Sequence, residues 1–461
     1  MTDQGKNFIE QLQVLGKRSD TLGESIQQLL SSYNNLNSTQ EQYQTLLREF
    51  GLEDEVRKSQ KDVKRYKMAT LLYIVIYGFS ELAQRSDASE QMDKLDEIFI
   101  TIQDIATKYR LVKIPTVGDN ILLAGGIEND TKTNPIDTTM AANGILAVIE
   151  KMKKSDPLCI WDVGIGLHTG PVIGRFLSSK RTPYTLSGNN VLTVTRLGFG
   201  AFKGHASMSP MTYELTKEFF DVRRCGKIPV KYSGAMDVYN LEGINEDLLD
   251  EDGKPNEEFE LTYQRIQFMD IQEYVLDMLE EQLPKNLYYH NVKHTIDVTT
   301  EVELIGWAEG LPEKDILLLK VAGLFHDSGH IKKYKGHEEE SCNYVREILP
   351  LFNYSQTKID EVCRIIMATQ LPHTPTDILE AVIQDSDLDY LGRGDFIPVS
   401  NMLYNELKER NAIGTMDQWN QAQIKFISAH QYYTKTALGL REVNKQIQIE
   451  RLKALIGNCE N

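Results

Sequence analysis

Histidine and aspartate residues that could bind a metal are concentrated in the C-terminal part of the chain, where seven of the nine histidines lie. His290 and His294 are four residues apart in YHNVKH, so they share a helix face if that segment is helical. The other candidate ligands are an adjacent pair and a later carboxylate: His326, Asp327, and one of Asp385, Asp387 and Asp389. Imidazoles and carboxylates that converge on one point bind divalent ions, and such an ion lowers the pKa of a water bound to it. The sequence therefore predicts a metal-dependent hydrolytic site.

Helices must position these residues. After Phe259 the strand signals fade and helical periodicity dominates, for example where 318–325 leads into the polar His326-Asp327 pair. We expect residues 261–461 to form an all-α domain. Oxygen and nitrogen donors without thiolate suit Mn, Fe, Mg or Zn, so the identity of the metal stays open.

Two motifs carry a family resemblance. YHNVKHTIDV resembles the YHNxxHxxDV element of class I cyclic-nucleotide phosphodiesterases, and LLKVAGLFHDSGH resembles their HD element. The resemblance implies an HD-superfamily phosphohydrolase that converts cyclic AMP or cyclic GMP to the 5′-monophosphate. It implies four metal ligands, with Asp327 bridging to a second ion: His294, His326, Asp327 and a late aspartate, which we take as Asp387. It also implies that His290 is the general acid that protonates the departing O3′.

Three further assignments extend this resemblance. His337 and His373 occupy places suited to the extra histidines with which many bacterial HD enzymes complete a second metal site, although each could equally be an ordinary core or surface residue. His330 is expected to orient a ligand or water from behind the ligands. Gln423 and Phe426 in AQIKFI resemble the segment that holds the purine in those phosphodiesterases, but the same spacing describes an ordinary amphipathic helix.

The middle segment, 66–244, has a different pattern. Expected strands at 69–77 and 160–167 alternate with expected helices at 92–109, 138–153 and 190–197, and a strand-turn-strand surrounds Gly118-Asp119. This alternation predicts α/β architecture.

TVGDNILLAGG, VGIGLHTGPVIGRFLSSKRTPYTLSGNNVLTVTRL and GHASMSP resemble the class III adenylyl and guanylyl cyclase homology domain, an α/β (ferredoxin-like) fold that forms head-to-tail dimers. Aligning the motifs puts three apolar residues at catalytic positions: Val75 for a metal aspartate, Pro115 for a base-contacting lysine and Leu192 for the transition-state asparagine. The resemblance thus implies a degenerate domain, a pseudocyclase. Two interpretations stay open: a residual site for a nucleotide effector, or a domain that only dimerises. The residues left for such a site are Asp119, Thr185 and Arg196.

Residues 1–65 and 245–260 flank the middle domain. Apolar residues at steps of three and four in 1–65 predict a dimerising coiled coil, although an amphipathic helix packed on its own domain gives a similar pattern. Residues 245–260 are acidic and are expected to form a linker.

The overall composition limits the kinds of partner and the location that we expect for this protein. A net charge of -17 disfavours a nucleic-acid partner. The five cysteines form no CxxC pair and the longest apolar run is too short to span a membrane, so we expect a cytoplasmic protein. The predicted coiled coil and the cyclase resemblance imply a homodimer. The predicted function is a metal-dependent cyclic-nucleotide phosphodiesterase. Its alternatives are a bifunctional cyclase and phosphodiesterase, and a catalytically silent nucleotide-sensing scaffold.

Overall fold

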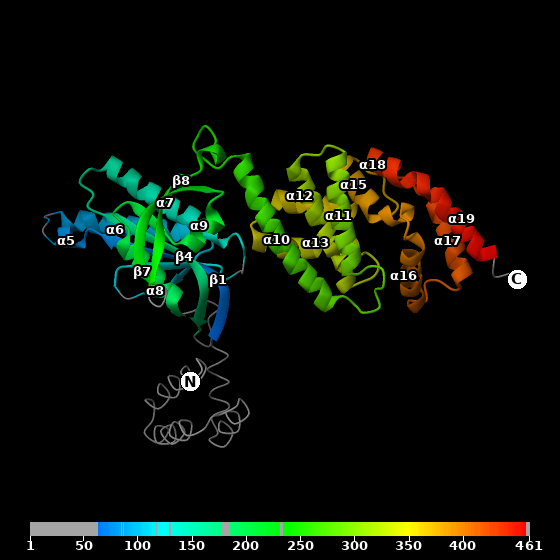
Figure 1. Ribbon diagram of the computed structural model, residues 1–461, viewed down its shortest axis with the longest axis horizontal. Helices are drawn as coiled ribbons and strands as arrows, with labels where there is room; N and C mark the ends of the chain where they lie inside the picture. The colour runs from blue at the N-terminus through cyan, green and yellow to red at the C-terminus, as the bar shows by residue number, and fades with distance from the viewer. Residues whose placement is uncertain are drawn as a thin grey trace, which may run out of the picture. The chain divides into compact units, whose positions relative to one another are not determined.

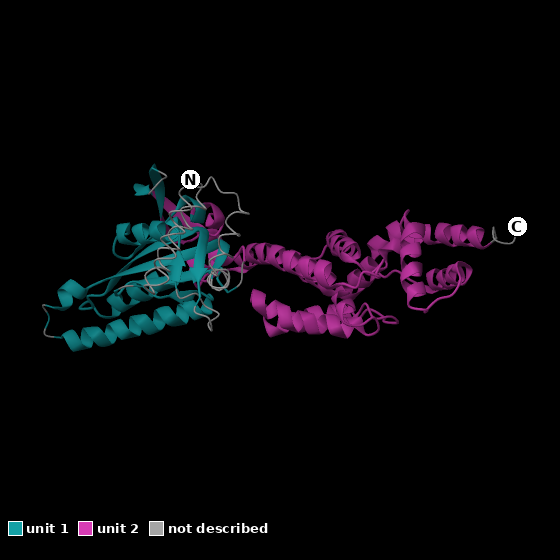
Figure 2. Cartoon of the chain, turned by 90° about the horizontal axis from the view of Figure 1, so that it is seen from below, with its two compact units in different colours: residues 1–128, 141–212, 225–239 teal, residues 129–140, 213–224, 240–461 magenta. Residues whose placement is uncertain are grey.

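The computed structural model describes residues 63–457 except 84, 86, 117, 129–130, 177–184 and 231–233. The predicted coiled coil at 1–65 therefore lies almost wholly outside the described residues. The chain divides into two compact units (Figure 2). The first takes in the described parts of 1–128, 141–212 and 225–239, and the second takes in those of 129–140, 213–224 and 240–461.

A mixed β-sheet organises the first unit. Its strands run in the order β2-β3-β1-β4-β6-β8-β7, and β5 pairs with β4. Pairing is antiparallel for β1 with β3 and β4, whereas β4 and β6 are parallel. The strands are β1 (Val63–Tyr77), β2 (Val112–Ile114), β3 (Ile121–Gly125), β4 (Asp162–Arg175), β5 (Thr185–Ser187), β6 (His205–Met208), β7 (Phe220–Val230) and β8 (Gly234–Ile244).

Helices accompany this sheet (Figure 1). They are α5 (Phe79–Leu82), α6 (Ala88–Lys108), α7 (Asn134–Ser155), α8 (Asn189–Gly200) and α9 (Pro210–Thr216). Helix α6 buries Leu95, Ile98 and Ile102, whose helical spacing gives one apolar stripe. Helix α8 packs directly on β4, because a Cβ at Gly166 would lie 2.3 Å from the backbone nitrogen of Gly198. The sequence prediction of an α/β domain in this region is confirmed.

The second unit is built mainly of helices, as expected (Figure 1). Helix α12 contacts α10, α11, α14 and α15, and buries Leu319, Val321 and Phe325 in the largest apolar cluster of this unit. The helices are α10 (Glu257–Gln282), α11 (Val292–Ala308), α12 (Glu313–Phe325), α13 (His337–Ile348), α14 (Gln356–Met367), α15 (Ile378–Asp387), α16 (Phe396–Glu409), α17 (Met416–Ala429), α18 (Lys435–Ala437) and α19 (Val443–Gly457).

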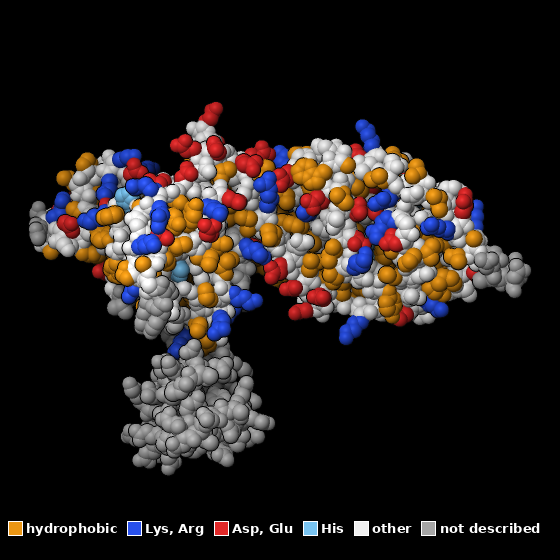
Figure 3. Space-filling model, in the orientation of Figure 1, with side chains coloured by type: hydrophobic (Ala, Val, Ile, Leu, Met, Phe, Trp, Pro, Cys, Tyr) orange, Lys and Arg blue, Asp and Glu red, His pale blue; other side chains and the backbone are white. Residues whose placement is uncertain are grey.

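The segment expected to be a linker is locally ordered. Acidic side chains gather over the loop that follows β8 (Figure 3). A 3₁₀ turn covers Glu246–Leu248, an isolated bridge joins Leu249 to Pro255, and α10 already begins at Glu257. Asn256 explains this order, because its Oδ1 accepts from the Phe259 backbone and its Nδ2 donates to the Asp247 and Leu249 carbonyls. The acidic composition predicted an exposed segment, but it could not predict these hydrogen bonds between the Asn256 side chain and the backbone.

Candidate metal centre

The adjacent His326 and Asp327 follow directly after α12. The Nδ1 of His326 lies 2.8 Å from the Gly323 carbonyl, which can only accept, so Nδ1 carries a proton and Nε2 is the nitrogen that faces Asp327 and Asp387. The Ser341 hydroxyl donates to the His326 carbonyl and accepts from the Gly329 amide. These bonds fix the direction in which His326 points.

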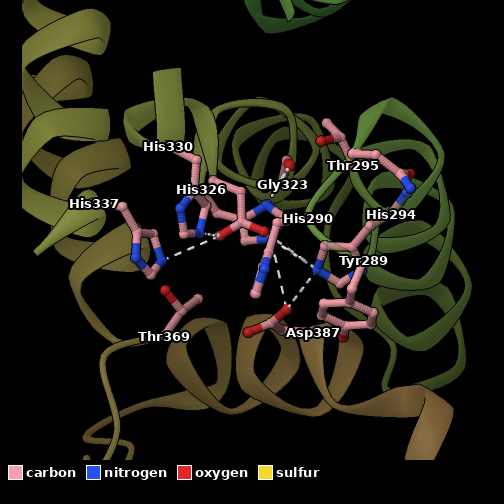
Figure 4. A network of polar contacts seen from close by, with 12 residues as sticks. Tyr289, His290, His294, Thr295, Gly323, His326, His330, His337, Thr369 and Asp387 are labelled. Atoms are coloured by element: carbon pink, nitrogen blue, oxygen red, sulfur yellow. Dashed lines mark hydrogen bonds and ion pairs between the residues drawn. The ribbon is translucent and has the colours of Figure 1, made fainter. Parts of the chain in front are cut away.

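His294 and Asp387 meet His326 at one point (Figure 4). The Nε2 of His294 lies 3.0 Å from Asp387 Oδ1 and 3.3 Å from His326 Nε2. Asp327 Oδ2 lies 3.3 Å from His326 Nε2 and 3.5 Å from His294 Nε2. The Nε2 atoms of His294 and His326 thus each lie 3.0–3.5 Å from an oxygen of Asp327 and from an oxygen of Asp387. Such a donor set suits a metal ion better than a hydrogen-bond network.

Electrostatics favour charged carboxylates here. Burial raises the pKa of Asp387, but hydrogen bonds from His294 and His326 outweigh it and hold the pKa well below its ordinary value. Burial acts likewise on Asp327, and the neighbouring His326 and His290 again leave its pKa lowered. The Oδ2 of Asp327 is buried without a hydrogen-bond partner. A buried charged oxygen without a partner is costly unless a cation occupies the site.

A second group of donors shares Asp327. Ligand atoms of His290, Asp327 and His330 lie within 4.8 Å of one another. His337 Nε2 is 3.2 Å from Asp327 Oδ1, and its ring stacks on His330 with centroids 3.9 Å apart. Burial lowers the pKa of His330 to about 3, so this imidazole is neutral. Neither of its ring nitrogens has a hydrogen-bond partner, which makes His330 a potential ligand, whereas the sequence analysis expected it to orient a ligand or water.

His290 is held by a residue that the sequence motifs missed. His290 precedes α11, because Asn291 is the helix N-cap, so the condition for a shared helix face with His294 is not met. The Nδ1 of His290 lies 2.5 Å from Oε1 of Glu406, a fully buried residue of α16. The other carboxylate oxygen accepts from the Tyr289 and His290 amides. This leaves His290 Nε2 as the nitrogen available to a substrate.

Glu406 stays ionised near neutral pH. Burial raises its pKa, but His290 and the Tyr289 amide outweigh this and lower it to about 2. Nothing in the sequence marks Glu406 apart from its place as a charged residue in an amphipathic helix.

A cavity of about 410 Å³ opens beside both donor groups. Its lining includes His290, Asp327 and Asp387, and also Gln423 and Phe426 of α17. Gln423 is 5% exposed and its Oε1 has no hydrogen-bond partner. Glu338, which the sequence analysis did not single out, also lines this cavity with an unpartnered Oε2. The cavity thus offers polar atoms in need of partners beside the ring of Phe426.

The remaining carboxylates and His373 do not join the cluster. Asp385 accepts from the Tyr433 and Thr434 amides, and Asp389 pairs with Arg441. The structure also keeps His373 out: its Nε2 lies 3.0 Å from Glu380 Oε2. The structure therefore does not bring His373 to either donor group, because the turn after α14 directs its side chain toward Glu380 of α15.

Glu380 anchors that turn and gives a testable pH dependence. Burial raises its pKa, but hydrogen bonds from His373, Thr376 and Arg364 outweigh it and lower the pKa from 4.5 to about 2. Because the folded pKa is depressed, the contribution to stability is present above pH 4.5 and is lost as pH falls toward 2. We expect Glu380→Gln to lower the urea midpoint at pH 7 and to weaken its pH dependence between pH 5 and 2.5. Urea titrations of both proteins check this; parallel midpoint curves would contradict it.

The residues expected to form a nucleotide site in the first unit lie on separate elements. Asp119 is exposed in the turn between β2 and β3, and Thr185 begins β5. Arg196 on α8 donates to the Pro229 carbonyl at 2.7 Å. No hydrogen bond or ion pair joins these three within the part of the chain that the structure describes. Val75 is 5% exposed and packs with Ile114 and Leu122, so this position belongs to the apolar core.

Comparisons with known proteins agree with this division. Residues 61–243 match the family model of the adenylate and guanylate cyclase catalytic domain, and residues 291–391 match that of the HD domain. The chain therefore joins a cyclase-homology domain to an HD domain. The HD match contains His294, His326, Asp327 and Asp387 and supports metal-dependent hydrolase chemistry in general.

Individual relatives cover the cyclase-homology domain. A membrane guanylyl cyclase of Dictyostelium discoideum is 25% identical over 179 residues, which are 39% of this chain and 12% of that protein. An adenylate cyclase of Mycobacterium tuberculosis is 25% identical over 181 residues, 39% of this chain and 40% of that protein. The chain thus spans less than half the length of these relatives. The guanylate cyclase domain of RhGC from Catenaria anguillulae, solved with GTP, matches with a TM-score of 0.35 and 24% identity over 40% of this chain and all of that chain.

None of the helices between residues 63 and 457, in the part that the structure describes, is long and apolar enough to cross a lipid bilayer.

Proposed function

We propose that this protein is a metal-dependent 3′,5′-cyclic-nucleotide phosphodiesterase whose cyclase-homology domain is a pseudocyclase that dimerises or regulates it. The observation that carries the proposal is the meeting of His294, His326, Asp327 and Asp387 beside a cavity that also contains His290. A merely structural metal site would not need a histidine held by a buried glutamate at the cavity wall.

The donor groups fit two divalent ions. His294, His326, Asp327 and Asp387 would hold the first, and Asp327 with His337 and His330 would hold the second. Nitrogen and oxygen donors without thiolate suit Mn, Fe, Mg or Zn. Ions bound there would polarise the phosphoryl oxygens and lower the pKa of a bound water.

The chain's own residues complete the reaction. His290 donates a proton to O3′ as the bond between phosphorus and O3′ breaks, which is the step that most needs a general acid because an alkoxide is a poor leaving group. Glu406 holds the imidazole through Nδ1, which leaves Nε2 available to the leaving group. Hydrolysis then yields the 5′-monophosphate with a free 3′ hydroxyl.

Gln423 and Phe426 are proposed to bind the base. The unpartnered Oε1 of the Gln423 amide can bind a purine edge, and the ring of Phe426 can stack on the purine face. We expect Gln423→Ala to raise KM about tenfold with little change in kcat, because a hydrogen bond made equally in ground and transition states is lost. Steady-state kinetics with Gln421→Ala, an exposed position on the same helix, is the control. A fall in kcat at unchanged KM would contradict this role.

The pseudocyclase assignment gives a negative prediction. Val75, Pro115 and Leu192 lack the charge and hydrogen bonding that cyclisation needs, which should cost several powers of ten in rate. We expect the full chain with Mn and ATP or GTP to form no cyclic nucleotide. Turnover that Asp119→Ala abolishes would show a functional cyclase and overturn the assignment.

The range of substrates tests the proposal. We expect the full chain with Mn to hydrolyse cyclic AMP or cyclic GMP faster, in kcat/KM, than the generic diester bis(4-nitrophenyl) phosphate. A reversed order would place the natural substrate among other phosphate esters. Comparing the two cyclic nucleotides would establish the base preference, and size measurement of the full chain would test the homodimer.

A further inference from the structure

Two cysteines face each other between α13 and α14. Cys342 is 2% exposed and Cys363 is 4% exposed, and both are free thiols. The Sγ of Cys342 lies 3.5 Å from the Cys363 carbonyl oxygen, and the Sγ of Cys363 lies 3.7 Å from the Cys342 carbonyl oxygen. Each thiol thus reaches the backbone of the other residue, and the two thiols hydrogen-bond to each other. The two sulfur atoms are therefore neighbours, as the partners of a disulfide must be.

Both helices lead to the metal centre. Helix α13 begins with His337, whose Nε2 contacts Asp327. Ser341, the neighbour of Cys342, holds the His326 carbonyl and the Gly329 amide. Helix α14 ends shortly before Thr369, which lines the cavity. A covalent link between these helices would therefore act on the backbone that positions the ligands.

We propose that Cys342 and Cys363 are a modification site, at which peroxide forms a reversible disulfide that weakens metal binding at the second donor group. The Cys363 thiolate attacks hydrogen peroxide, the O–O bond breaks, and a sulfenic acid and hydroxide form. The Cys342 thiol then attacks that sulfur, and its proton leaves with the displaced hydroxyl group as water, so that two thiols and one peroxide give one disulfide and two waters.

Cys363 is the first nucleophile. Hydrogen bonding with the Cys342 thiol lowers the pKa of Cys363, which raises its thiolate fraction. Closing the S–S bond draws α13 toward α14 and moves His337 relative to Asp327. Disturbing residues that orient metal ligands typically costs 10- to 100-fold in affinity, so we expect Mn to bind about tenfold more weakly in the oxidised protein.

Peptide mapping and Mn titration of the full chain test this inference. The chain carries Cys159→Ser, Cys225→Ser and Cys459→Ser, so that only the pair remains. After treatment with hydrogen peroxide, unreduced digests should contain one peptide in which the segments around Cys342 and Cys363 are linked. Calorimetric titration should show the weaker Mn binding, and dithiothreitol should restore it.

Substituting Cys363→Ala in this background provides the control, because peroxide should then leave Mn affinity unchanged. Circular dichroism verifies that each protein is folded. A folded protein whose pair stays reduced would overturn the inference, as would a linked peptide without any change in Mn affinity. Neither readout uses hydrolysis of a cyclic nucleotide, so the outcome is independent of the proposed phosphodiesterase activity.

Discussion

Asp387→Ala is expected to lower turnover of the cyclic nucleotide by about 1,000-fold or more. Asp387 contacts both His294 and His326, and losing a metal worth several kcal/mol of transition-state stabilisation corresponds to a factor of this size. Mn affinity should fall by more than the roughly 100-fold typical of residues that only support ligands. Metal analysis after gel filtration and steady-state kinetics measure both effects.

Asp385→Asn is the matched control for this prediction. Asp385 lies two residues away in the same DSD motif, but it accepts hydrogen bonds from the Tyr433 amide and from Thr434. We expect this variant to lose stability and to keep its metal. If both variants lost metal equally, the effect of Asp387→Ala would be damage to the fold; retained metal and turnover in Asp387→Ala would remove Asp387 from the site.

His290→Ala is expected to lower kcat for the cyclic nucleotide by about 100- to 10,000-fold, the range associated with loss of a general acid. The proton donor matters only when the leaving group is basic. Hydrolysis of bis(4-nitrophenyl) phosphate, whose leaving group needs no proton, should therefore fall less than about tenfold. Parallel kinetics with the two substrates measures this difference.

Glu406→Gln separates orientation from proton donation. The amide keeps an acceptor for His290 Nδ1 but removes the negative charge, so we expect an intermediate loss in kcat with KM and bound metal unchanged. For the His290→Ala variant, equal losses with the cyclic nucleotide and with bis(4-nitrophenyl) phosphate would contradict the role of general acid. Such a result would instead make His290 a metal ligand, consistent with its place near Asp327 and His330.

Local sequence motifs predicted the elements of the fold and the members of the cluster more readily than the supports around them. The adjacent His-Asp pair, the upstream histidine and the late aspartate each stand in a short motif, so these cluster members can be recognised from the sequence alone. Glu406 lies 116 residues after His290 and meets it only through the packing of α16. No spacing rule in one sequence encodes such a contact.

His373 shows what residue type alone cannot predict. A histidine downstream of predicted ligands suits a second metal by its type alone, but the direction of its side chain depends on how the turn after α14 is tied to α15. Glu380 and Gln384 tie that turn, through bonds to Thr376, His373 and the Ala368 carbonyl. Composition predicted an acidic linker at 245–260, but it could not show that Asn256 orders part of this segment through its side-chain amide.

The most direct test of the account is hydrolysis of cyclic AMP and cyclic GMP by the purified full chain with Mn, beside a His326→Ala, Asp327→Ala variant, with the products identified by chromatography. The account predicts that the full chain forms the 5′-monophosphate of at least one of them and that the folded variant forms none. Failure of the folded, metal-loaded chain to hydrolyse either compound, or equal hydrolysis by the variant, would contradict it.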